Sequence, residues 1–90
     1  MKITYDPIKR NKTLAERGLD FVDAEKVFEG RVATREDTRF AYGETRYITA
    51  GRLDNRLVVL VWTPRGDARH IISMRYGHAK EEEGYRNALD

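Results

Sequence analysis

The segment RLVVLVWT, residues 56–63, contains an unbroken apolar run and decides the fold of this 90-residue chain. Its β-branched and aromatic residues favour a strand over a helix. An apolar run without polar alternation is typical of a strand that is covered on both faces. We therefore expect residues 57–63 to form the central strand of a sheet with further structure packed on each side.

The segments on either side of this run predict its neighbours in the sheet. ETRYITAGR, residues 44–52, is rich in strand-forming residues but keeps a polar face, and Asp54-Asn55 supplies a turn before the central strand. PRGD, residues 64–67, supplies the next turn and leads into a strand at 69–76. We expect an antiparallel sheet of three to four strands.

Helices are predicted at both ends of the chain. Asp6-Pro7 is typical of a helix start and Gly18 of a helix end, so a helix should span Pro7 to Arg17. A second helix should follow Asp20 and a third should span Ala79 to Leu89. The side chains that the second helix should bury are Phe21, Ala24, Val27 and Phe28. The expected fold class is α+β, with two N-terminal helices, the sheet and a C-terminal helix in a single domain over residues 1–90.

Composition narrows the classes of function. The chain has no cysteine, and its two histidines, His70 and His78, lack the spacing of a metal-ligand motif. It also lacks the glycine-rich loops and nucleophile motifs of nucleotide hydrolases and acyl transferases. We expect no metal and no cofactor. Without a signal segment at the start or an apolar run long enough to span a bilayer, we expect a cytoplasmic protein with no membrane association.

Positive charge is concentrated in the predicted sheet. The formal net charge of the whole chain is only +2, but all cations between residues 46 and 78 are arginines. The guanidinium group matches phosphate oxygens better than the ammonium group of lysine does. These arginines are Arg46, Arg52, Arg56, Arg65, Arg69 and Arg75. This distribution favours a phosphate-containing partner.

Simple alternation along strand 69–76 divides its side chains between two faces. Arg69, Ser73 and Arg75 would share one face with Ile71, and His70 and Tyr76 would lie on the other. The sequence leaves open which face lines a cleft.

These residue types can cleave RNA without a metal ion. The substrate provides its own nucleophile, because a base can take the proton of the 2′-hydroxyl while arginines neutralise the phosphate and an acid protonates the leaving oxygen. Glu81 and Tyr85 lie four residues apart on the final predicted helix, so they either act together or form a surface pair.

The order of several motifs resembles the BrnT family of type II toxins. The motifs are YDPIKRNKTLAERGLDFVDAEKVF at 5–28, GETRYITAG at 43–51, RLVVLVWTPRG at 56–66 and HIISMRYGHAKEEEGY at 70–85. The resemblance implies a RelE-like fold and a ribonuclease that arrests growth by cutting RNA. It further implies neutralisation by BrnA, a ribbon-helix-helix antitoxin, and repression of the shared operon by the complex of the two proteins.

The residues and this resemblance together predict a site. Arg75, helped by Arg46, should stabilise the phosphate, Glu81 or His78 should handle the proton, and Tyr85 should orient one of them. An ion pair between Glu44 and Arg46 is the structural alternative for that strand. The residues expected to bind RNA are Lys9, Arg10, Lys12, Arg69, His70 and Ser73.

The sequence leaves a second function open. The chain could be a catalytically weak or inactive member that binds a BrnA-like antitoxin and tunes its own operon. A plain RNA-binding module is disfavoured because most aromatics lie at core spacings. The expected partners are the antitoxin, mRNA and, through the antitoxin complex only, operator DNA. The sequence also leaves a homodimer open.

Overall fold

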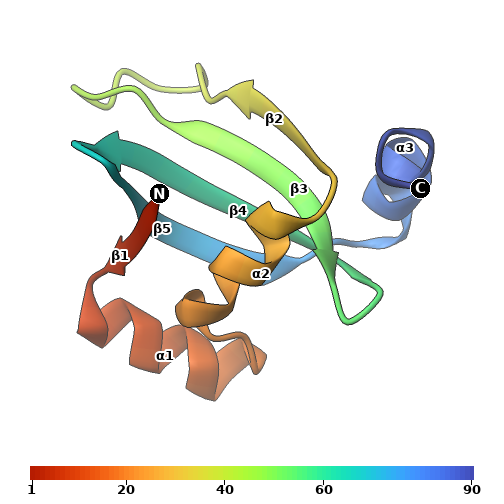
Figure 1. Ribbon diagram of the computed structural model, residues 1–90, viewed down its shortest axis with the longest axis horizontal. Helices are drawn as coiled ribbons and strands as arrows, with labels where there is room; N and C mark the ends of the chain where they lie inside the picture. Colours follow the sequence, from red (N-terminus) through yellow and green to blue (C-terminus); the bar gives the residue numbers. More distant parts are fainter.

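A single five-stranded sheet, with strand order β1-β5-β4-β3-β2, organises the computed structural model, which describes all residues 1–90 (Figure 1). The elements along the chain are β1 (Lys2–Tyr5), α1 (Pro7–Arg17), the 3₁₀ turn η1 (Phe21–Asp23), α2 (Ala24–Glu29), β2 (Val32–Glu36), β3 (Tyr47–Leu53), β4 (Arg56–Arg65), β5 (Ala68–Tyr76) and α3 (Ala79–Leu89). The class is α+β, as expected. None of the three helices has the length and apolar character needed to cross a membrane.

Strand β4 lies at the centre of the sheet and contributes to the core on both faces. One face carries Val58, Leu60 and Trp62, which pack with residues of η1 and α2. The other carries Leu57 and Val59, which pack with residues of β3 and with Leu89 of α3. The unbroken apolar run is therefore explained by two separate cores, and α3 alone covers the second.

The first helix has the ends that its sequence predicts. The Asp6 carboxylate accepts a hydrogen bond from the Ile8 amide at 2.9 Å, and Gly18 ends the helix with a φ of 70°. This left-handed conformation is one that glycine adopts without steric cost. The second predicted helix is divided into η1 and α2, and it buries Phe21, Ala24 and Val27 while Phe28 is half-buried.

The expected antiparallel sheet of three to four strands was wrong in two respects. Strand β1 pairs in parallel with β5, so the sheet is mixed. Strand β2 is a further strand at the other edge, next to β3. Two parallel strands are not joined by a hairpin turn, so no turn motif in the sequence predicts the pairing of β1 with β5. Strand β2 is mostly polar because its edge position leaves much of it in solvent.

A β-bulge interrupts the alternation of β5. Val61 of β4 pairs with Ser73 and Trp62 pairs with Ile71, so Ile72 has no partner. The extra residue brings Ile71 and Met74 into the same core, although they are three positions apart. The expected grouping of Arg69 with Ser73 and Arg75 on one face was therefore wrong.

Gly77 connects the sheet to the final helix at a point of close contact. A Cβ atom at this position would overlap the side chain of Leu57. The Gly77 amide donates to the Leu57 carbonyl at 2.9 Å, which fixes the direction in which the chain leaves β5. The position of α3 above the sheet therefore depends on a residue without a side chain.

Candidate functional site

A small polar pocket lies between α3 and the sheet face that α3 covers. Its volume is about 190 Å³. The wall contains three arginines, one carboxylate and two hydroxyl groups, together with apolar side chains of β3 and β4. The lining residues are Arg35, Arg39, Ile48, Val59, Val61, Ser73, Arg75, Glu81 and Tyr85. The pocket therefore combines cations with groups that can exchange a proton.

Arg75 and Glu81 form the central ion pair of this pocket. The two terminal nitrogens of Arg75, Nη1 and Nη2, donate to the two carboxylate oxygens of Glu81 at 2.7 and 2.8 Å. Hydrogen bonding from Arg75 lowers the pKa of Glu81 to about 2, and the same pairing raises the pKa of Arg75. Glu81 is therefore a fixed anion near neutral pH and a weak acceptor for a substrate proton.

His78 lies at the start of α3, next to this pair. Its amide donates to Glu81 Oε1 at 3.1 Å, and its ring Nε2 is 3.3 Å from the same oxygen. The side chain is 67% exposed, so the imidazole can exchange protons with solvent or a ligand. Tyr85 lies one helical turn after Glu81 and lines the pocket as well.

Arg35 and Arg39 are pocket residues that sequence interpretation missed. Arg39 is fixed by Asp37, whose fully buried side chain accepts bonds from Arg39 Nε and Nη2, both at 2.8 Å. Hydrogen bonds from Arg39 hold the pKa of Asp37 well below its ordinary value. Both arginines come from the polar stretch 31–43, which contains none of the predicted site residues. The only available signal was the alternation of VATRE, which places Arg35 on the face of Ala33.

The bulge determines which predicted residues of β5 reach the pocket. Ser73 and Arg75 line it, whereas Arg69 lies on the opposite face with its guanidinium carbon 3.9 Å from the centre of the Phe28 ring. His70 bonds through Nδ1 to the Thr4 hydroxyl at 2.9 Å, outside the pocket lining. Burial, aided by the charge of Arg65, lowers the pKa of His70.

Arg46 is not part of the pocket wall. Its Nε donates to Glu44 at 2.9 Å, and its guanidinium carbon lies 4.1 Å from the centre of the Tyr42 ring. The alternative of an ion pair between Glu44 and Arg46 is therefore the arrangement found. Arg46 supports the loop that carries Arg39, and Arg35 and Arg39 are the cations beside Arg75.

The predicted RNA-binding cations of α1 lie far from the pocket in the fold. α1 contacts η1, which packs on the sheet face opposite α3 (Figure 1). Arg10 is engaged by Asp20, with Nη2 at 2.6 Å from Oδ2, while Lys9 and Lys12 are exposed. The structure thus brings Ser73, Arg75, Glu81 and Tyr85 together and leaves the basic face of α1 as a separate surface.

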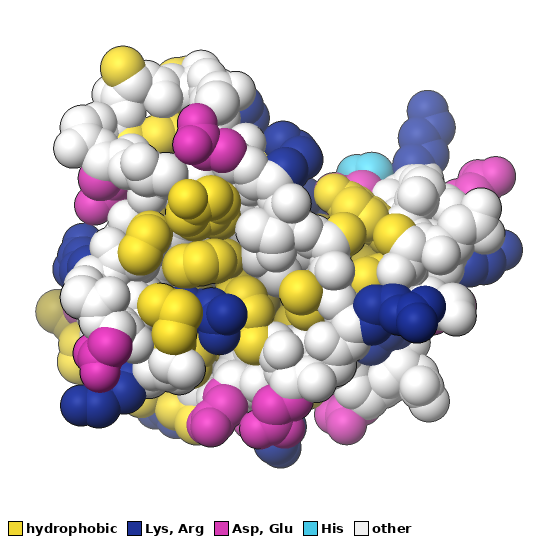
Figure 2. Space-filling model, turned by 45° about the horizontal axis from the view of Figure 1, so that its top comes forward, with side chains coloured by type: hydrophobic (Ala, Val, Ile, Leu, Met, Phe, Trp, Pro, Cys, Tyr) yellow, Lys and Arg dark blue, Asp and Glu magenta, His cyan; other side chains and the backbone are white.

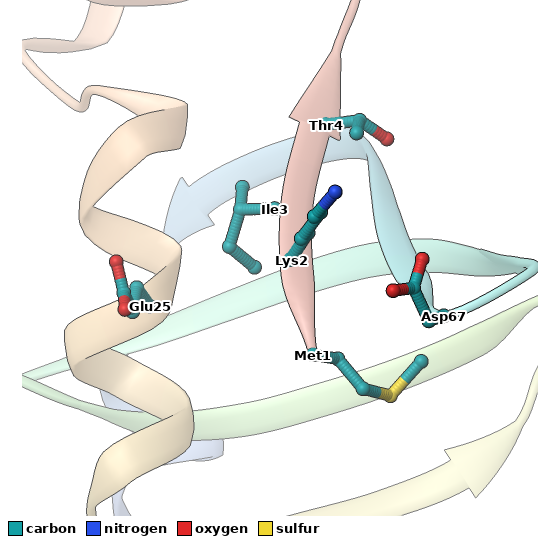
Figure 3. Close-up of a pocket in the computed structure, with 6 residues that line it drawn as sticks. All are labelled: Met1, Lys2, Ile3, Thr4, Glu25 and Asp67. Atoms are coloured by element: carbon teal, nitrogen blue, oxygen red, sulfur yellow. The ribbon is translucent and has the colours of Figure 1, made fainter.

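A larger hollow of about 760 Å³ lies along β1, but its chemistry is different. It is lined by Met1, Lys2, Ile3, Thr4, Glu25 and Asp67. The carboxylates of Glu25 and Asp67 lie on opposite sides of β1 (Figure 3). No arginine lines this hollow, and Lys2 is its only cationic side chain.

Comparison with known protein families gives a match over most of the chain. The family model described as "Ribonuclease toxin, BrnT, of type II toxin-antitoxin system" matches residues 5–81, which is most of the chain. No curated protein matches the chain. The family match confirms the resemblance seen in the sequence. The chain belongs to the BrnT family of ribonuclease toxins of type II toxin–antitoxin systems.

Proposed function

We propose that this chain cleaves RNA at the pocket under α3 by attack of a ribose 2′-hydroxyl on the adjacent phosphate. The observation that carries the proposal is the clustering of Arg35, Arg39 and Arg75 around Glu81 in a chain of a ribonuclease toxin family. Three guanidinium groups can stabilise the charge that develops on the phosphate. The resulting growth arrest would follow from loss of mRNA, and the RelE-like relationship implied by the family stays a prediction.

The acidic and basic steps can be assigned to different residues. His78 takes the proton of the 2′-hydroxyl, and Glu81 stabilises the protonated imidazole at Nε2 while it orients Arg75. The bond from O2′ to phosphorus forms as the bond to the 5′ oxygen breaks. The hydroxyl of Tyr85 protonates the leaving 5′ oxygen. The products are a 2′,3′-cyclic phosphate and a 5′-hydroxyl end.

The donor set of the pocket supports a mechanism without a metal ion. Glu81 is the only carboxylate in the wall, and both of its oxygens already accept hydrogen bonds from Arg75. Divalent cations such as Mg²⁺ are usually bound through carboxylate oxygens that are free to coordinate them. The arginines therefore supply the positive charge in this proposal.

One observation favours the second function, an inactive subunit. Arg75 Nη1 also donates to the Tyr76 carbonyl, so both terminal nitrogens of Arg75 are engaged within the protein. A phosphate must use the remaining N–H groups of Arg75 or displace Glu81. If neither occurs, the chain serves as the antitoxin-binding and operon-regulating partner without cleaving RNA.

A type II toxin implies an antitoxin partner, and we propose that this partner is a BrnA-like ribbon-helix-helix protein. It inhibits either by covering the arginine-lined pocket or by binding the basic face of α1. Because these surfaces lie on opposite sides of the sheet, hydrogen exchange of the complex distinguishes them. Protection of neither the pocket residues nor α1 would contradict both.

The direct test uses the purified chain and an RNA oligonucleotide whose cut position has been mapped. Cleavage should persist in EDTA, should stop when one deoxynucleotide replaces the ribose 5′ of the cut, and should yield a cyclic phosphate. Equal cleavage of the deoxy-substituted oligonucleotide would overturn the mechanism. Expression of the chain alone should arrest growth, and normal growth with soluble protein would favour the inactive subunit.

A further inference from the structure

Phe40 is exposed and directly follows Arg39, a residue of the pocket wall, although most aromatic side chains of this protein are packed in its cores. Its relative exposure is 70%, and every other aromatic residue of the chain is buried or half-buried. Figure 2 shows that hydrophobic side chains gather in patches on one face, with Lys and Arg side chains beside them. An exposed aromatic beside cations is a common feature of surfaces that bind single-stranded nucleic acid.

The loop that carries Phe40 is held in place from within. The Asp37 carboxylate accepts a hydrogen bond from the Tyr42 hydroxyl at 2.9 Å, and the Asp37 amide donates to the Arg46 carbonyl at 2.7 Å. The Phe40 and Tyr42 rings pack edge to face with their centres 5.7 Å apart, and Arg46 covers Tyr42. Phe40 is therefore supported by Tyr42 and Arg46, while its own ring stays in solvent.

The same loop contributes a phosphate-binding candidate to the pocket. Arg39 precedes Phe40 directly, and its guanidinium lines the pocket with Arg35 and Arg75. A nucleotide presents a charged phosphate and a flat base on one flexible backbone. Adjacent cationic and aromatic side chains match those two parts.

We propose that Phe40, supported by Tyr42, stacks on the base of a nucleotide next to the phosphate held in the pocket. This inference rests on the proposed ribonuclease function and specifies its substrate as single-stranded RNA, because a base within a duplex is already stacked on both faces. Stacking on an aromatic ring discriminates weakly among bases, so Phe40 contributes affinity and fixes the position of the strand more than it selects a sequence.

The test is a cycle that combines a protein change with a substrate change. Wild type and Phe40→Ala are compared on the mapped RNA oligonucleotide and on oligonucleotides with an abasic ribose at each position flanking the cut. On the intact RNA, Phe40→Ala should lower kcat/KM by about tenfold or more, the usual effect of losing one stacked base. At one position the abasic substrate should lower the kcat/KM of wild type by a similar factor. The same abasic substrate should lower the kcat/KM of Phe40→Ala little below its value on intact RNA.

Two further variants make the result specific. Phe40→Trp should retain stacking and most of the activity, and Ile8→Ala should leave kcat/KM unchanged because Ile8, 79% exposed, lies on α1 across the sheet. Additive losses at every abasic position would overturn the inference. So would a Phe40→Ala variant that cleaves normally but no longer binds the antitoxin, which would assign Phe40 to the protein partner. Absence of cleavage by wild type would instead refute the proposed function itself.

Discussion

Arg75 of β5 and Glu81 of α3 are joined by two hydrogen bonds, from Nη1 to Oε1 at 2.7 Å and from Nη2 to Oε2 at 2.8 Å. The pair links the last strand to the helix that forms the opposite wall of the pocket. Because the geometry is bidentate, it fixes the plane of the guanidinium as well as its position. The same contact thus holds the pocket together and orients its central cation.

Replacing Arg75 should abolish most of the cleavage while the fold is kept. Arg75→Ala removes a charge-stabilising donor, a change that typically costs about 10²–10³ in rate. Arg75→Lys should recover little, since an ammonium cannot reproduce the bidentate contact. The matched control is Arg65→Ala, because the Arg65 side chain is 55% exposed and lies outside the pocket. Initial rates and circular dichroism measure the effects, and undiminished cleavage by Arg75→Ala would remove this residue from the mechanism.

The pH dependence of the rate should distinguish His78 from Glu81 as the base. Pairing with Arg75 lowers the pKa of Glu81 to about 2, so Glu81 stays ionised at every pH at which the protein is assayed. An imidazole that acts as the general base must be neutral, so this role of His78 predicts that kcat/KM falls as the pH is lowered.

The pH–rate profiles of three variants test whether His78 is the base. His78→Gln should lose the acid-side fall in rate together with most of the activity, whereas Glu81→Gln should be slower but retain the fall. His70→Gln is the control, because His70 bonds to Thr4 of β1 whereas His78 lies beside Glu81. An acid-side fall that disappears in Glu81→Gln but persists in His78→Gln would reverse the assignment.

The Arg75–Glu81 pair should also make stability depend on pH. The pKa of Glu81 is about 2 in the folded protein, against an ordinary value of 4.5, so between these values the unfolded chain binds more protons. The free energy of unfolding should therefore rise with pH across this window and lose this contribution as pH falls towards 2. Urea unfolding from pH 3 to pH 6 should show a smaller slope for Glu81→Gln than for wild type. Equal slopes would mean that the ion pair does not form in solution.

Local sequence rules accounted for the elements whose determinants are local. Asp6 and Gly18 define α1, and the turn residues Asp54 and Asn55, with φ of 50° and 66°, close the hairpin between β3 and β4. The apolar run of β4 indicated layers on both faces, which the two cores confirm. Each of these features depends on a few adjacent residues.

The features that sequence could not predict depend on contacts between distant segments. The bulge at Ile72 follows from the register of β5 against β4, and it separates Arg69 from Arg75. Arg39 enters the pocket because the buried Asp37 fixes the loop after β2. The sequence of β2 is polar and charged, so it is difficult to distinguish from that of a loop. Periodicity within one segment contains no information on either relationship.

The buried carboxylate of Asp37 should be as important for the site as the arginine that it holds. Asp37→Asn weakens the charge-assisted bonds to Arg39, so the loop should loosen and both thermal stability and kcat/KM should fall. Faster hydrogen exchange at the Arg39 amide, which donates to Asp37 at 3.2 Å, reports the loosening directly. Asp67→Asn is the matched control, because Asp67 is exposed in the turn between β4 and β5. A stable Asp37→Asn variant with normal exchange would show that the loop is held by other contacts.

Tyr85 should be required only for departure of the 5′ oxygen. Tyr85→Phe removes the proposed acid but keeps the ring, so cleavage of ordinary RNA should slow by about 10²-fold or more, as for loss of a general acid. An oligonucleotide with sulfur in place of the leaving 5′ oxygen needs little protonation, because a thiolate is a much better leaving group. On that substrate Tyr85→Phe should approach the wild-type rate, while Arg75→Ala should remain slow because its phosphate still lacks a cation. If the sulfur substrate rescues both variants or neither, Tyr85 is not the acid, and its hydroxyl acts only as part of the pocket wall.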